Sequence, residues 1–131
     1  GGIGCLDVYG SGPALVRFAN EKGPVEQFGS GREVTERAAA GDHAARAAID
    51  TLASWIGVGI ANAVALLDPE AIVVSGGLAL AGDIVLGPIR RALGDELARR
   101  GVAATPRVVD GQLAGLAPVL GAARSTVGAE W

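Results

Sequence analysis

The stretch between residues 43 and 67 constrains the fold more than any other part of the sequence. Its apolar residues recur at three- and four-residue spacing, the signature of one helix face: Ile49, Leu52, Ile56, Ile60, Ala63 or Val64, and Leu67. A helix over this run would be roughly 37 Å long. The near-apolar part from Trp55 to Leu67 falls short of the roughly 20 residues that span a bilayer. The pattern therefore predicts a long buried helix and no membrane anchor.

A second stripe on the same helix holds only small side chains, at every fourth position: Ala53, Gly57, Ala61 and Ala65. Small side chains let another backbone approach closely. We expect tight packing against a neighbouring helix or sheet at this stripe. The alternative is that Gly57 and Gly59 make room for a ligand.

The rest of the chain alternates helices with short strands. Residues 70–75 form a β-branched run without polar alternation, which predicts a strand buried on both faces of a parallel sheet, and residues 106–109 predict a second strand. Helices are predicted at residues 7–9, 14–19, 33–40, 43–67 with Asp42 as N-cap, from Asp83 or Pro88 to Arg100, and at 116–125. This order indicates an α/β protein with parallel strands and long helices. Two strands are few for so many helices, so we expect further strands upstream of Gly1 in a longer chain.

Composition excludes several classes of protein. With 50 % hydrophobic and 19 % charged residues, the chain is not globally disordered. The net charge of −3 and a single lysine, Lys22, argue against bulk capture of nucleic acid. Cys5 is the one cysteine and allows no internal disulfide, and the first residues form no signal peptide. We therefore predict a cytoplasmic location.

Few residues in this sequence carry chemistry. His43 is the one histidine, so there is no Ser/His/Asp grouping and no metal site built from these residues alone. The pair Gly76–Gly77 stands at the carboxyl end of the predicted strand, where open α/β sheets bind ligands. Two glycines there let a flat ligand or a phosphate approach the backbone, although glycines also serve such turns for geometry alone.

An ordered set of motifs resembles the carboxyl-terminal half of the ROK family (repressors, open reading frames and sugar kinases). The matching segments are Gly1–Asp7, Ser11–Leu15, Ala39–Asp42, Gly57–Asn62, Leu67–Gly77, Ala81–Asp83 and Leu113–Ala123. The first resembles the end of the family's cysteine-rich signature and the last its closing tail. Together they span nearly all 131 residues.

The resemblance implies an actin/hexokinase-like (ribonuclease H-like) ATPase fold. Residues 1–131 would be the incomplete carboxyl-terminal nucleotide-binding lobe of a longer two-lobe chain. A family kinase binds ATP and Mg²⁺ against this lobe and phosphorylates a hexose in the cleft between lobes, with its catalytic aspartate in the other lobe. These residues alone would then be inactive, and the resemblance also implies a homodimer.

Three sets of residues carry over from the family. Cys5 matches the last cysteine of a structural Zn²⁺ site whose other ligands would precede Gly1. Asp7 matches a glutamate that accepts hydrogen bonds from sugar hydroxyls, and here the side chain is one methylene shorter. Gly76 and Gly77 match the glycine turn at the adenosine site.

Other positions depart from the family pattern. Ser75 replaces a frequent glycine, and the tail reads Ala114, Gly115, Leu116 and Pro118 where the family has small, acidic or glycine residues. These changes leave open a degenerate nucleotide site. The alternative function is the sugar-sensing domain of a ROK-type transcriptional regulator, which would bind DNA through a segment upstream of these residues.

Overall fold

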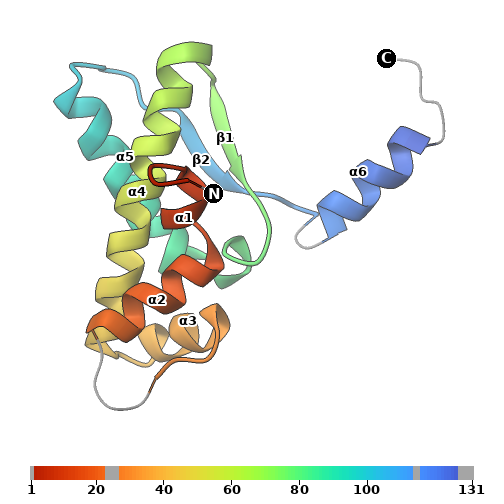
Figure 1. Cartoon of the computed structure of the whole chain (residues 1–131). Helices are drawn as coiled ribbons and strands as arrows, with labels where there is room; N and C mark the ends of the chain where they lie inside the picture. The colour runs from red at the N-terminus through yellow and green to blue at the C-terminus, as the bar shows by residue number, and fades with distance from the viewer. Residues whose placement is uncertain (1, 23–26, 114–115, 127–131) are drawn as a thin grey trace.

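The computed structural model of the chain describes residues 2–22, 27–113 and 116–126. In chain order its elements are α1 (Leu6–Tyr9), α2 (Gly12–Lys22), α3 (Gly31–Ala39), α4 (His43–Leu67), β1 (Ala71–Val74), the 3₁₀ turn η1 (Ala79–Ala81), α5 (Asp83–Arg99), β2 (Arg107–Asp110) and α6 (Ala117–Thr126). Helix α4 runs through the middle of the molecule, while α6 projects away from the other helices (Figure 1).

Side-chain caps fix the starts of α3 and α4. Ser30 Oγ accepts a hydrogen bond from the Glu33 amide at 3.2 Å and so caps α3. Glu33 Oε2 in turn accepts one from the amide of Gly29, the residue before the cap, at 2.9 Å. Asp42 Oδ1 accepts from the Ala45 amide at 3.0 Å, as predicted for the N-cap of the long helix. This bond, together with the Arg37 guanidinium, lowers the pKa of Asp42 below its ordinary value.

The long helix forms much of the core, but the predicted apolar face is buried only in part. Ile49, Leu52 and Val64 are buried, whereas Leu67 is 75 % exposed. The helix contacts α1, α2, α3 and α5, and its buried residues are Ala45, Ala48, Ile49, Leu52, Ala53, Gly57, Ala61 and Val64. Among the described residues, α4 is the helix whose length and composition would suit a membrane span. Its buried face packs against four other helices, as the central helix of a globular core does, while Leu66 and Leu67 at its end are exposed.

Tight packing at the small-residue stripe is confirmed for Ala53, Gly57 and Ala61, which are buried, whereas Ala65 is exposed. A Cβ at Gly57 would lie 2.9 Å from the Ala92 carbonyl carbon and 3.0 Å from the Leu93 nitrogen on α5. A Cβ at Gly59 would lie 2.5 Å from a methyl group of Leu6 on α1. The backbone of α5 therefore accounts for Gly57, whereas Gly59 meets only the movable end of the Leu6 side chain. The alternative of a ligand is not needed to explain Gly57.

The two strands pair in parallel, in a register that runs from Ala71 opposite Arg107 to Val74 opposite Asp110. The predicted burial of the first strand on both faces is wrong for the described chain, because Val73 is 64 % exposed. Its neighbours Ile72 and Val74 pack against the core, so the helices cover one face of the strand.

Helix α5 begins at Asp83, the earlier of the two predicted starts, and carries Pro88 inside it. The Arg90 side chain anchors this helix to the sheet, donating to the Val108 carbonyl at 3.0 Å and pairing with Asp83 at 2.6 Å. The extended piece predicted at residues 25–28 lies mostly outside the described residues.

Candidate functional site

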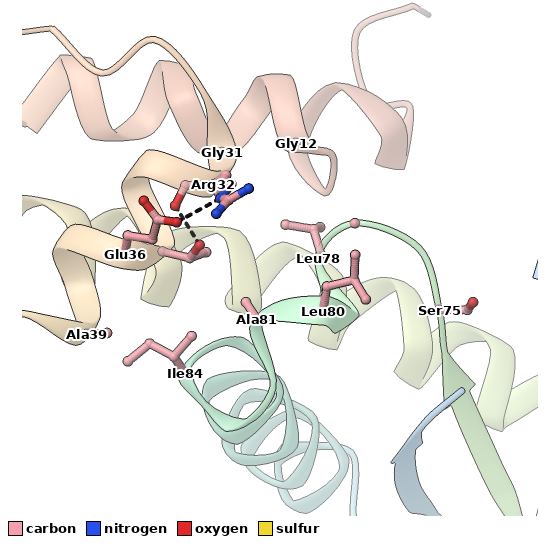
Figure 2. A pocket seen from close by; sticks show the side chains of 12 residues that line it. Gly12, Gly31, Arg32, Glu36, Ala39, Ser75, Leu78, Leu80, Ala81 and Ile84 are labelled. Atoms are coloured by element: carbon pink, nitrogen blue, oxygen red, sulfur yellow. Dashed lines mark hydrogen bonds and ion pairs between the residues drawn. The ribbon is translucent and has the colours of Figure 1, made fainter. Parts of the chain in front are cut away.

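A cleft of about 940 Å³ opens beside the carboxyl end of β1. Four segments line it: the start of α2, one face of α3 along its length, the turn after β1, and the region from η1 into α5 (Figure 2). The lining residues are Gly12, Gly31, Arg32, Thr35, Glu36, Ala39, Ser75, Gly77, Leu78, Leu80, Ala81 and Ile84. The cleft thus lies at the sheet edge where α/β proteins bind their ligands.

The glycine pair predicted from the sequence forms the turn at this edge. Gly76 has a φ of +88°, a conformation that favours glycine, and its carbonyl accepts from the Ala79 amide at 3.1 Å. Gly77 lines the cleft, and a Cβ built there would meet no atom within 4 Å. Gly76 is therefore explained by backbone conformation, whereas nothing in the packing of the described protein requires glycine at position 77.

The opposite wall of the cleft comes from α3. Arg32 Nε donates to Glu36 Oε1 at 2.7 Å, and Thr35 Oγ1 donates to the Arg32 carbonyl at 2.8 Å. The hydrogen bond and the charge of Glu36 raise the pKa of the Arg32 guanidinium above its ordinary value. Glu36 is the one carboxylate among the lining residues, so it balances the one guanidinium there.

Sequence reasoning missed this wall. The residues of α3 are far from Gly77 along the chain, and their helical spacing alone gives an ordinary surface ion pair. The available signal was the capped start of α3, which fixes where Arg32 and Glu36 project. That signal does not say which segment they face.

Ser75, for which the sequence suggested no role, follows β1 directly. A Cβ at Gly111 would lie 3.2 Å from the Ser75 Cβ, so the chain after β2 passes close to this serine. The Gly111 amide donates to the Val74 carbonyl at 2.8 Å. Ser75 thus sits where the ends of both strands meet, at one border of the cleft.

The structure places Cys5 and Asp7 outside this cleft, at α1. Cys5 is an exposed free thiol in the N-cap position, where its side chain makes no capping bond. Asp7 lies in the first turn of α1 and is exposed, and it does not occupy the N-cap position. The short helix is held by contacts of Leu6 with Gly59 and by the ring of Tyr9, which lies 4.5 Å from that of Trp55.

The described residues offer no complete metal site. No group of three or more histidine, cysteine or acidic side chains lies close enough within them to hold an ion. A zinc ion at Cys5 would need ligands that the described residues do not supply, and in the cleft the Glu36 carboxylate is taken by Arg32. Of the unusual tail residues, Ala114 and Gly115 lie outside the described part.

A short parallel sheet, long helices and a cleft at the end of β1 define part of one lobe of an actin/hexokinase-like ATPase. The ROK family model matches residues 1–126, and the chain belongs to the ROK family. A ROK family glucokinase from Streptomyces griseus, solved in complex with glucose and AMPPNP, is 33 % identical with a TM-score of 0.79. The match covers 93 % of this chain and 44 % of that one.

Two further proteins are similar to this chain. The glucokinase of Streptomyces coelicolor is 32 % identical over 138 residues, which cover 94 % of this chain and 44 % of the relative. A ROK family transcriptional regulator, a homolog of the E. coli MLC protein, is 24 % identical with a TM-score of 0.61, covering 82 % of this chain and 29 % of that one. At that identity the regulator shows the fold alone. The chain spans less than half the length of the glucokinases it matches.

Proposed function

We propose that residues 1–131 form the carboxyl-terminal nucleotide-binding lobe of an ATP-dependent sugar kinase that phosphorylates a hexose. The observation that carries this proposal is the bare Gly77 backbone, which lines the cleft beside β1 without any packing need for glycine. Glucokinases at 32–33 % identity, one of them solved with glucose and AMPPNP, support ATP as the phosphoryl donor and glucose as the first hexose to test.

In this proposal the turn Gly76–Gly77 lets the nucleotide lie against the backbone. The positive φ of Gly76 turns the chain sharply after β1, and the absent side chain of Gly77 leaves room for the ligand. In-line phosphoryl transfer depends mostly on positioning and on charge stabilisation, so the turn would contribute by orientation. Mg²⁺ would neutralise charge on the phosphates, and we assign neither its ligands nor the proton-accepting aspartate to residues of this chain.

We assign Asp7 of α1 and Cys5, the residue before that helix, to the sugar side of the protein. Asp7 is exposed, and its carboxylate can accept hydrogen bonds from sugar hydroxyls. Cys5, two residues earlier, would be one ligand of a structural Zn²⁺ that stiffens this short helix. We further propose a cytoplasmic homodimer.

The test is sugar phosphorylation by the full-length protein with ATP and Mg²⁺ over a panel of hexoses. The proposal predicts transfer of the γ-phosphate to at least one hexose. If the protein instead binds hexoses and a DNA operator but transfers no phosphate, the chain is the sugar-sensing domain of a regulator. That result would refute the kinase proposal.

A further inference from the structure

The α3 wall of the cleft has no role in the proposal above, although it faces the nucleotide turn. Arg32 is the one cationic side chain among the lining residues, and it is 87 % exposed. Its Nε donates to Glu36 Oε1 at 2.7 Å, so in this arrangement the pair engages one edge of the guanidinium. Figure 2 shows this pair on α3, across the cleft from Leu78 and Leu80. A guanidinium held along one edge still offers its flat face to a ligand.

The charge of this wall argues against a phosphate as its ligand. Arg32 and Glu36 together carry no net charge, and a triphosphate beside them would meet the Glu36 carboxylate as well as the guanidinium. A neutral aromatic ring meets no such repulsion. It gains from stacking on a guanidinium face.

The apolar wall that faces α3 across the cleft also suits a neutral aromatic ring. Leu78, Leu80 and Ile84 line the cleft with apolar side chains, which can cover a planar ring but offer no hydrogen bond to a phosphate. A base between this apolar wall and the guanidinium would have both faces covered. The ribose attached to it would then lie against the bare backbone of Gly77.

We propose that Arg32 stacks on the nucleobase of the bound nucleotide, with Glu36 as the positioning residue that holds the guanidinium flat. This inference rests on the proposed nucleotide site and assigns the base end of that site. It also implies a preference for purine nucleotides, because a purine offers a larger ring surface for stacking than a pyrimidine.

The experiment compares Arg32→Ala with Arg91→Ala in the full-length protein. Arg91 is a matched control, because it is an exposed arginine, paired with Asp50 at 3.7 Å, and it does not line the cleft. Calorimetry measures the affinities for ATP and for UTP, which share the ribose and the triphosphate. Arg32→Ala should weaken ATP binding roughly 5- to 30-fold and weaken UTP binding less. The preference of the protein for ATP over UTP should therefore decrease. Arg91→Ala should leave the affinities for both nucleotides unchanged.

Three results would each overturn a distinct part of this account. Equal weakening of ATP and UTP would mean that Arg32 contacts phosphate or ribose, and the stacking assignment would be wrong. An ATP affinity in Arg32→Ala equal to that in Arg91→Ala would remove Arg32 from the site while leaving the nucleotide proposal intact. If the unchanged protein binds neither nucleotide, the proposed function itself fails.

Discussion

The close approach of α4 and α5 predicts that alanine at position 57 destabilises the protein. In an exposed helix, replacing glycine by alanine stabilises by about 1 kcal/mol. At Gly57, however, the added Cβ would lie 2.9 Å from the Ala92 carbonyl carbon, a distance that real Cβ atoms essentially never show. That neighbour is backbone, so one helix must shift relative to the other.

A matched pair of variants measures the cost of the added methyl group at position 57. Overpacking a well-packed core costs about 1–3 kcal/mol. Gly94 lies on α5, where a Cβ would meet no atom within 4 Å, so Gly94→Ala should keep the helix gain of about 1 kcal/mol without any clash. Since both variants gain the same helix propensity, the difference between them isolates the overpacking cost. We expect Gly57→Ala to be less stable than Gly94→Ala by about 1–3 kcal/mol.

Urea unfolding of the full-length protein, followed by circular dichroism, measures this difference through the free energies of unfolding. Equal stability of the two variants would refute the close α4–α5 packing. So would a Gly57→Ala protein more stable than the unchanged one by the full helix gain.

Two further predictions concern α1. If Asp7 holds a sugar hydroxyl, Asp7→Asn should lower hexose affinity on the order of 10- to 150-fold at nearly unchanged melting temperature. Asp7→Glu should retain hexose binding. Hexose affinities of Asp7→Asn equal to those of the unchanged protein would remove Asp7 from the site. If Cys5 is a zinc ligand, metal analysis of the full-length protein should find one zinc per protomer and a loss of that zinc in Cys5→Ser. Equal zinc content in both proteins would exclude the assignment.

The sequence predicts the helical core of this protein well because local signals mark its boundaries. The long helix starts after Asp42 and ends before Asp68, as its cap and the Asp68–Pro69 stop indicate. The boundaries of the two strands were also predictable, because each observed end lies within one residue of the end predicted from the sequence. The sequence leaves two starts for α5, Asp83 and Pro88, because proline also suits the first helical turn.

Features that depend on distant contacts could not be predicted in this way. The exposure of Val73 reflects which face of β1 the helices cover, and an apolar run carries no information on that choice. The α3 wall of the cleft is a second example. Arg32 and Glu36 form an ordinary helix pair in the sequence, and their place at the same cleft as Gly77 follows from how α3 packs against α2, α4 and α5.

The central claim is that the turn after β1 binds a nucleotide, and calorimetry of Gly77→Val with ATP and with glucose tests it most directly. The substitution has room in the protein, because a Cβ at Gly77 meets no atom within 4 Å, and Gly94→Val is a control with equally open surroundings outside the cleft. We predict that Gly77→Val lowers ATP affinity by roughly tenfold or more, which corresponds to about 1.4 kcal/mol, and leaves glucose affinity unchanged. Gly94→Val should leave the affinities for ATP and for glucose unchanged. A folded Gly77→Val protein that binds ATP as tightly as the unchanged protein would contradict the account.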